Sequence, residues 1–269
     1  MNFTKYHIAG KDYIFIADEN DFSRLQKNCI SRLCNRHKGI GADGIFTFNK
    51  NQGKMSLLRG FIQNGDIMQN FSSASICGFF EQFLLTTATE YTFSSESGIN
   101  YTVNAIKSDA KALFGAYLNS CLTEGIFSAI NRKTEIGNRI LTITPIELIS
   151  IYAVHFSDCK EKLQISYLGH HISHNSMLKK SANLILAQET EKNTFDISFY
   201  ENSTGNSRPD ISAFAATALA ACKNSICRFG DEISVSYSNN KVDVICLSEK
   251  NVYIKVSCER VFSGNAFCD

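Results

Sequence analysis

The stretch NRHKGIGADG, residues 35–44, decides how the chain folds locally, because its glycines follow a helical pattern and precede an apolar run. Gly39, Gly41 and Gly44 form the string GxGxxG, which in dinucleotide-binding proteins joins a strand to a following helix. Here the apolar residues of 22–34 recur at helical spacing, and a run typical of a strand begins directly after Gly44. The sequence therefore predicts a loop between a helix and a strand, and disfavours a dinucleotide site.

The first half of the chain combines short strands with a second helix. Residues 72–85 are predicted to form that helix, with Ser72 or Ser73 as its cap. Its expected apolar stripe consists of Ile76, Phe79, Phe80, Phe83 and Leu84. Strands are expected at residues 3–6, 13–17, 45–48, 57–62, 91–93, 100–106 and 115–118.

The second half repeats this outline. An alanine-rich helix is expected at residues 210–222, with Asp210 as an N-cap whose carboxylate suits the positive end of the helix. A further helix is expected near residues 159–167. Strands are expected at residues 140–143, 149–155, 183–188, 194–200, 232–236, 241–246 and 252–256. This repetition indicates an internal duplication of α+β units, with a boundary near residues 116–120.

Composition excludes several classes of protein. The 269 residues include 27 basic and 26 acidic side chains, so the net charge of +1 gives no long-range attraction to nucleic acid or to an anionic membrane. No apolar run approaches the roughly 20 residues that span a bilayer. The N-terminus lacks the charge and apolar pattern of a signal peptide. We therefore expect a soluble cytoplasmic protein.

The ten cysteines contain no CxxC pair, which disfavours a zinc ribbon or a thioredoxin motif. We expect them to be small buried hydrophobic residues in a reducing compartment. His170, His171 and His174 have helical spacing, but we expect no metal site there. The other histidines are interpreted as structural.

Several motifs, in the same order along the chain, resemble the diaminopimelate epimerase family. The stretch FTKYHIAGKDY, residues 3–13, is similar to the family's FTKMHGxGNDF, and residues 35–44 are similar to its DRxxGIGADG. Residues 168–174, LGHHISH, resemble LGPxIExH, and residues 259–264, ERVFSG, resemble the last strand, VFxG. The resemblance covers nearly the whole chain.

The resemblance implies an α+β fold of two pseudo-symmetric halves, each a mixed sheet or barrel wrapped around a central helix. The expected halves are residues 1–117, to which residues 257–269 return, and residues 118–256. In the family, two thiols at helix starts in the cleft between the halves exchange the α-proton of an amino acid, without pyridoxal phosphate or another cofactor. Helix N-termini suit the substrate carboxylate and lower the thiol pKa from its usual value near ~8.5.

Both thiol positions are altered in this chain. Counting from QNGD, residues 63–66, places Ser72 at the first position. Counting from Glu201 and Asn202 places Asp210 at the second position. An alcohol opposite a carboxylate is a poor pair for moving a proton between two faces of a substrate, so we expect no two-thiol reaction.

The neighbouring ligand contacts are depleted as well. Glycines of the family's helix starts are replaced by larger residues, which place side chains where a substrate carboxylate would approach. The positions that resemble the family's ligand-binding residues are Lys11, Gln63, Ser73, Ala74, Asn183, Glu201, Asn202, Ile211 and Ser212. Asn183 and Glu201 keep the family's residue type.

Three hypotheses follow from this pattern. The first is a degenerate paralogue that has lost the epimerase reaction and binds a small amino-acid-like or carboxylate ligand, a second copy of itself or an active homologue. The second is an isomerase of a different substrate that uses Asp210 as a single base. The third is a genuine diaminopimelate epimerase of lysine biosynthesis. None of the three requires nucleic acid or a membrane.

Overall fold

The computed structural model describes residues 1–49, 55–85, 88–106, 113–119, 130–136, 139–159, 163–173, 178, 182–202, 205 and 207–267. The chain forms two compact units. Unit 1 comprises Met1–Ala116 together with Val256–Asp269, and unit 2 comprises Tyr117–Lys255.

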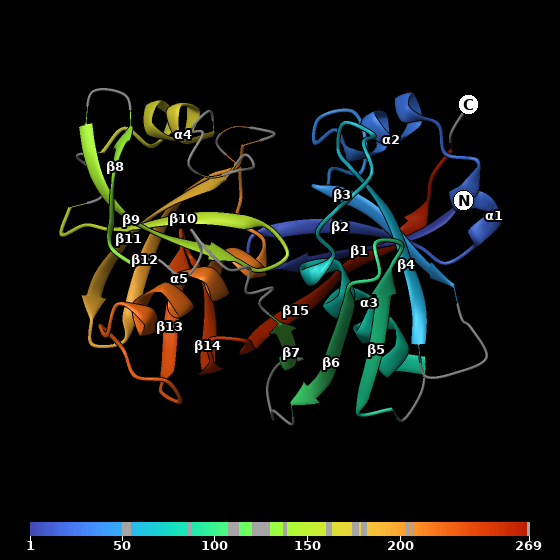
Figure 1. Ribbon diagram of the computed structural model, residues 1–269. Coiled ribbons are helices and arrows are strands. Elements are labelled where there is room, and N and C mark those ends of the chain that lie inside the picture. The colour runs from blue at the N-terminus through green and yellow to red at the C-terminus, as the bar shows by residue number, and fades with distance from the viewer. Residues whose placement is uncertain are drawn as a thin grey trace. The chain divides into compact units, whose positions relative to one another are not determined.

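Unit 1 is a mixed sheet wrapped around one helix (Figure 1). Its strands in chain order are β1 (Asn2–Ile8), β2 (Lys11–Ile16), β3 (Gly44–Asn49), β4 (Met55–Ile62), β5 (Glu90–Ser95), β6 (Asn100–Ile106) and β7 (Leu113–Asn119). The last strand, β15 (Asn251–Asn265), enters unit 1 and pairs antiparallel with β1. Helix α3 (Ser72–Leu85) contacts β1, β2, β3 and β6.

The helix expected at residues 22–34 is two helices, α1 (Glu19–Ser23) and α2 (Lys27–Cys34). The single-helix prediction was wrong because Asp18 caps an earlier start, and the chain is already extended again at Gln26. The apolar spacing that suggested one helix remains meaningful, since both segments pack on one core cluster.

The glycines of the loop before β3 are required by its backbone. A Cβ atom on Gly39 would lie 2.1 Å from the carbonyl oxygen of Arg32, and Gly41 has a φ of +78°. Both positions exclude larger residues, the first by close contact and the second by conformation. The GxGxxG string thus serves a tight turn between α2 and β3, as the sequence predicted.

Unit 2 has the same design. Its strands are β8 (Arg132–Ile136), β9 (Arg139–Glu147), β10 (Ile151–Phe156), β11 (Asn183–Glu191), β12 (Thr194–Tyr200), β13 (Glu232–Tyr237), β14 (Asn240–Ser248) and the beginning of β15. Helix α5 (Ile211–Lys223) is buried along its length except at its last residue, and contacts β9, β10, β11, β13 and β14. Helix α4 (Ile165–Ser173) begins later than the helix expected near 159–167, of which residues 160–162 lie outside the described part. Strand β8 was not predicted.

The two units share one order of strand pairings. In unit 1, β2–β3 is parallel, β3–β4 antiparallel, β4–β5 parallel and β5–β6 antiparallel. In unit 2, β10–β11, β11–β12, β12–β13 and β13–β14 repeat this series. In both units the central helix occurs, in chain order, between the two strands of the second parallel pair. The expected α+β fold, with a mixed sheet around a central helix in each half, is confirmed.

The cysteines differ from the expectation in one case. Those with free thiols are Cys34, Cys77, Cys159, Cys222, Cys227, Cys246 and Cys258. Cys29, on the partly exposed side of α2, is disulfide-bonded, so the prediction that the cysteines are thiols was wrong there. Cys121 and Cys268 lie outside the described residues.

Candidate functional site

The first candidate position, Ser72, is the first residue of α3 and is fully buried. The side-chain oxygen of Asn70 accepts hydrogen bonds from the Ser72 backbone N–H, at 3.0 Å, and from the Ser72 hydroxyl, at 2.8 Å. The expectation that Ser72 or Ser73 caps this helix therefore needs correction, because the amide of Asn70 reaches the first turn from two residues upstream. An amide oxygen takes up no proton near neutral pH, so this contact does not activate the hydroxyl.

Lys11 and Gln63 lie at strand ends beside the glycine loop. The backbone N–H of Gln63 donates to the carbonyl of Asp43 at 3.1 Å, and the N–H of Asp43 donates to the carbonyl of Asp12 at 2.8 Å. Gln63 is exposed, and Lys11, next to Asp12, is half-buried. The sequence positions 11 and 63, far apart in the chain, are thus brought to one end of the strands of unit 1.

An ion network lies beside Lys11 and Gln63, formed by charged residues of the two motifs at residues 3–13 and 35–44. Arg36 contacts the carboxylates of Asp12 and, at 3.0 Å, Asp43, while Lys5 lies 3.9 Å from Asp12. Burial works against the charge of Arg36, but the two carboxylates more than offset it and raise the pKa of Arg36. These motif residues therefore hold the glycine loop against β2.

The second candidate position, Asp210, is the N-cap residue of α5, as expected. Its carboxylate accepts from the Ser212 backbone N–H at 3.5 Å, a long contact, and its carbonyl accepts from the Ala213 N–H at 2.9 Å. Asp210 is 7% exposed, and Ile211 and Ser212 are fully buried. A negative side chain of the protein itself thus occupies the positive end of this helix.

Tyr152 lies at a position that resembles the family's ligand-binding tetrad, but its contact with Ser212 was not predicted from the sequence. Its hydroxyl forms a 2.7 Å hydrogen bond with the Ser212 hydroxyl, and its side chain is 1% exposed. Burial raises the pKa of Tyr152, hydrogen bonds from Ser212 and Ser150 counteract this, and the charges of Asp210 and Glu201 raise it further. Tyr152 is therefore neutral across the physiological range. Its place opposite Asn183 on adjacent strands was the available signal, and it required the register of β10 and β11.

Asn183, Glu201 and Asn202 lie near Tyr152. The side-chain oxygen of Asn183 accepts from the Asn202 backbone N–H at 3.0 Å. Glu201 exchanges two backbone hydrogen bonds with Gly205, at 2.8 and 2.7 Å, which fix the turn after β12. The candidates of the second half therefore gather at one polar cluster, which consists of Tyr152, Asn183, Glu201, Asn202, Asp210 and Ser212.

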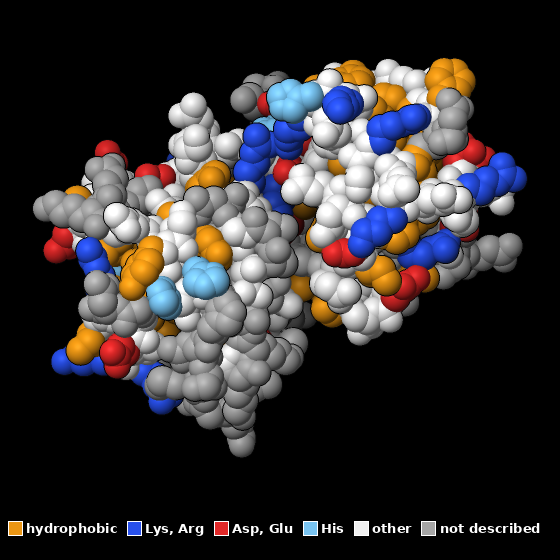
Figure 2. Space-filling view, turned by 90° about the horizontal axis from the view of Figure 1, so that it is seen from above, with side chains coloured by type: hydrophobic (Ala, Val, Ile, Leu, Met, Phe, Trp, Pro, Cys, Tyr) orange, Lys and Arg blue, Asp and Glu red, His pale blue; other side chains and the backbone are white. Residues whose placement is uncertain are grey.

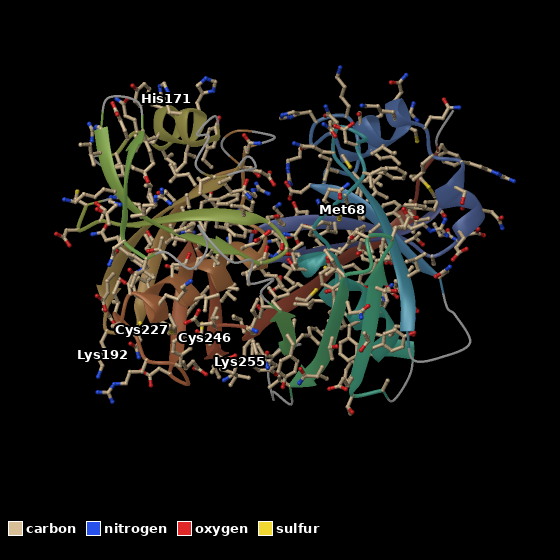
Figure 3. The ribbon with its side chains drawn as sticks, viewed as in Figure 1. Met68, His171, Lys192, Cys227, Cys246 and Lys255 are labelled. Atoms are coloured by element: carbon tan, nitrogen blue, oxygen red, sulfur yellow. The ribbon has the colours of Figure 1, made fainter. Side chains whose placement is uncertain are left out.

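The cysteines of the two central helices do not lie at the helix starts. Cys77, inside α3, is buried with its sulfur 3.7 Å from that of Cys258. Cys222 contacts the carbonyl of Arg228 at 3.6 Å, at the opposite end of α5 from Asp210. Burial raises the pKa of Cys227 to about 12, which keeps it protonated at neutral pH. Figure 3 shows Cys227 and Cys246 together at the base of unit 2.

The histidines of α4 lie on the surface of unit 2. The rings of Tyr167 and His171 are 4.5 Å apart, and those of His170 and His171 are 5.8 Å apart. Figure 2 looks onto this surface and shows pale blue histidine side chains beside hydrophobic ones. Within the described part of the chain, no group of three or more potential ligands is arranged to hold a metal ion, and His174 lies outside it. None of the described helices is long and apolar enough to cross a bilayer.

Sequence comparisons give full-length relatives at low identity. No protein-family model matches the chain. A diaminopimelate epimerase of Halothermothrix orenii is 24% identical over 286 residues, covering 98% of this chain and 97% of the relative. A diaminopimelate epimerase of Bacillus cytotoxicus is 23% identical, covering 98% and 96%.

Solved structures show the same fold. A phenazine biosynthesis protein of the PhzF family from Bacillus anthracis superposes with a TM-score of 0.69 at 12% identity, covering 100% of this chain and 99% of the other. A probable proline racemase from Agrobacterium radiobacter with bound carbonate gives 0.68 at 11%, covering 100% and 93%. A methylitaconate-delta-isomerase gives 0.59 at 9%, covering 98% and 95%.

These observations agree with one another. The relatives align over almost their whole length, the motifs occur in the family's order, and both units wrap a mixed sheet around a central helix. The chain is thus similar over almost its whole length to diaminopimelate epimerases, and it has Ser72 and Asp210 at the starts of its two central helices.

Proposed function

We propose that this protein does not exchange α-protons between two thiols, although it retains the epimerase fold. One observation carries the proposal: at both helix starts an oxygen atom of the chain itself accepts from a first-turn N–H. Asn70 provides this oxygen at α3, and Asp210 provides it at α5. In a working epimerase such N–H groups would serve the substrate carboxylate.

The acid–base chemistry supports the same conclusion. A hydroxyl is too weak an acid to shuttle a proton without a paired base, and Ser72 donates to a neutral amide. A free aspartate has a pKa near ~3.9, which makes it a weak base for an α-proton. The two groups therefore do not form the matched pair that proton exchange across two faces requires.

Solvent-deuterium exchange tests this proposal directly. The purified protein would be incubated with LL- and meso-diaminopimelate in deuterium oxide, beside the relative from Halothermothrix orenii as a positive control. We expect the control to label the α-carbon and this protein to give only the background seen without enzyme. Labelling or turnover at a rate comparable with the control would overturn the proposal and establish an ordinary diaminopimelate epimerase.

An isomerase that uses a single base is the alternative that a specific observation favours. Asp210, Glu201 and the neutral hydroxyl of Tyr152 share one polar cluster, so a base and a hydrogen-bond donor lie near each other. A methylitaconate-delta-isomerase also shares the fold. The test is proton exchange in a panel of unsaturated carboxylic acids. Asp210→Asn should abolish any exchange, whereas the exposed control Asp158→Asn should not.

Ligands and partners belong to the same proposal. A protein whose own side chains occupy the two helix starts is expected to act by binding. The expected partner is a small carboxylate or amino acid, a second copy of the chain, or an active homologue in the cytoplasm. Light scattering of the purified chain, alone and mixed with an active epimerase, distinguishes these forms by mass. A monomer in both measurements would remove the two protein partners and leave the small ligand.

A further inference from the structure

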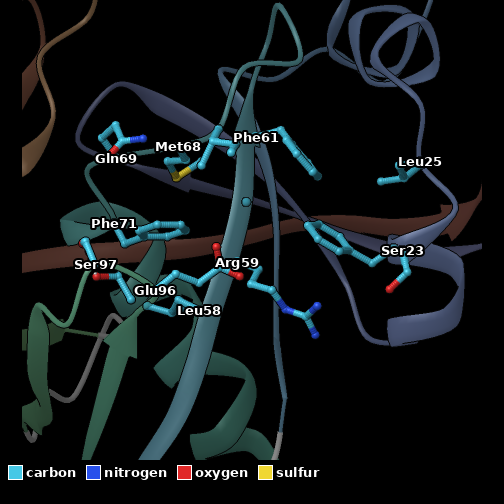
Figure 4. Close-up of a pocket in the computed structure, with 14 residues that line it drawn as sticks. Ser23, Leu25, Leu58, Arg59, Phe61, Met68, Gln69, Phe71, Glu96 and Ser97 are labelled. Carbon is cyan, nitrogen blue, oxygen red and sulfur yellow. Dashed lines mark hydrogen bonds between the residues drawn. The ribbon is translucent and has the colours of Figure 1, made fainter.

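A cavity of about 580 Å³ lies in unit 1 where β4 and β5 separate (Figure 4). The two strands pair in parallel only from Met55↔Thr92 to Leu58↔Ser95. Beyond that point the segment before α3 runs beside β4 instead, and the N–H of Met68 donates to the carbonyl of Gly60 at 2.9 Å. The opening between this segment and the end of β5 has the size of a small-molecule site.

Apolar side chains line the cavity on both sides of β4. Phe22 of α1 and Phe61 of β4 stack with ring centroids 5.4 Å apart and an interplanar angle of 21°. Met68 and Phe71 are buried on the other side of β4 in Figure 4, and Ile67 is 62% exposed at the rim. Such a lining receives an aliphatic or aromatic group and removes its apolar surface from water.

Two opposite charges complete the lining. Among the described residues that line the cavity, Arg59 is the basic one and Glu96 the acidic one. A terminal nitrogen of Arg59 lies 3.4 Å from Glu19, and its buried Nε has no hydrogen-bond partner. A guanidinium has five N–H donors, so this contact leaves donors for a ligand. Glu96 is exposed and has room to reorient.

Hydrogen bonds within residues 95–99 hold the turn that carries Glu96. The Ser95 hydroxyl hydrogen-bonds the Ser97 hydroxyl at 2.8 Å and accepts from the Ile99 N–H at 3.2 Å. Gly98, with a φ of +80°, donates its N–H to the carbonyl of Ser95 at 2.9 Å. The acidic group is therefore held on an ordered turn at the edge of the cavity.

We infer that this cavity binds an amino acid with an apolar side chain. The α-carboxylate would pair with Arg59, the α-ammonium with Glu96, and the side chain would pack against Phe22 and Phe61. A cation, an anion and an apolar wall around one space match the three groups of such a ligand. The lining includes neither Ser72 nor Asp210, although Phe71 directly precedes Ser72, so the inference goes beyond the proposed function.

Calorimetric titration of the full chain with L-phenylalanine and L-leucine tests the inference. We expect saturable binding of both, and weaker binding of L-glutamate and L-lysine. N-acetyl-L-phenylalaninamide lacks both charges, so its affinity should be lower than that of L-phenylalanine by about tenfold or more. Absence of saturable binding for both apolar amino acids, or equal affinity for the uncharged derivative, would overturn the inference.

Variants locate the binding within the chain. Arg59→Gln and Glu96→Gln should each weaken L-phenylalanine binding about tenfold, because each removes a charge-assisted contact. Arg24→Gln on the exposed end of α1 and Glu90→Gln at the start of β5 are the matched controls, and should bind as the unmodified chain does. Thermal unfolding of each variant shows whether it folds. Because Glu96 is exposed, its substitution should disturb folding less than that of Arg59.

Two further variants distinguish this site from the start of α5. Ser23→Trp, at the exposed rim of the cavity, should block binding, whereas Asp210→Ala should leave it unchanged. Binding that Asp210→Ala abolishes and Ser23→Trp does not affect would place the ligand at α5 and refute the inference. Neither outcome alters the deuterium-exchange result, so the two proposals fail independently.

Discussion

The two central helices begin in different ways. At α3, neutral groups meet, since the amide of Asn70 accepts from the backbone and hydroxyl of Ser72. At α5, ionisable groups meet, because Asp210 caps the helix and Tyr152 contacts Ser212 within reach of two carboxylates. The two units are alike in topology, so this difference arises from a few side chains. Of the two helix starts, only that of α5 therefore brings ionisable side chains together.

The helices differ in their packing as well. In α3, Phe79 packs against Phe83 and Phe114, and Phe83 is 40% exposed near the end of the helix. In α5, alanines surround the fully buried Phe214. The central helix of unit 2 thus presents mostly small residues to its strands, whereas that of unit 1 packs aromatic rings.

The largest expected effect tests this contrast in packing. Phe214→Ala should lower the free energy of unfolding by about 3–5 kcal/mol, because small rigid neighbours cannot fill the vacated volume. Phe79→Ala should cost less, because the neighbouring ring of Phe83, which is partly exposed, can move into the space. Urea unfolding followed in each unit by amide hydrogen exchange measures both. A larger loss for Phe79→Ala would contradict the contrast.

Much of the fold could be predicted from the sequence because it depends on local patterns. The alanine-rich pattern and Asp210 predicted α5 to within one residue at each end. The glycine string predicted the loop before β3, which needs glycine at Gly39 and Gly41. The break at residues 24–26 was missed because the apolar spacing continues across it.

The site was harder to predict because its contacts join distant residues. Tyr152 meets Ser212 across 60 positions of sequence, and Asn70 replaces the expected cap by a turn whose geometry the residue types alone do not specify. The cavity beside Arg59 depends on where β4 and β5 stop pairing. Pairing register is a tertiary property, so no local pattern indicates it.

A smaller effect compares the two caps. Asp210→Ala and Asn70→Ala should each destabilise by about 1 kcal/mol, since each leaves a helix N–H without its acceptor. The exchanges Asp210→Asn and Asn70→Asp keep an acceptor and should cost little. Hydrogen exchange of the first-turn amides is the measurement, and it should rise only in the unit that carries the alanine. Equal exchange in both units would show that the caps are not independent.

Alkaline pH should destabilise unit 2 through Tyr152. Its pKa is raised in the folded chain, so both states keep the proton below pH ~10, and the stabilisation is fully present there. Above that pH the unfolded chain releases the proton first, and stability falls as pH rises toward the folded pKa. Tyr152→Phe should therefore flatten the decline of the melting temperature of unit 2 above pH ~10. An unchanged decline would argue that Tyr152 is not buried beside Asp210.

The smallest expected effect is the most informative for function. The double variant Ser72→Cys with Asp210→Cys restores both thiols, yet we expect no epimerisation of LL-diaminopimelate in a coupled assay. A thiol at each helix start supplies the proton carriers but not the ligand contacts, because the resemblance implies that Lys11, Gln63 and Asn202 still replace the family's residues. The variant also removes the Asp210 cap, so it should unfold more easily without gaining activity. A rate like that of the relative from Halothermothrix orenii would mean that substrate recognition survived and that only the two bases were lost.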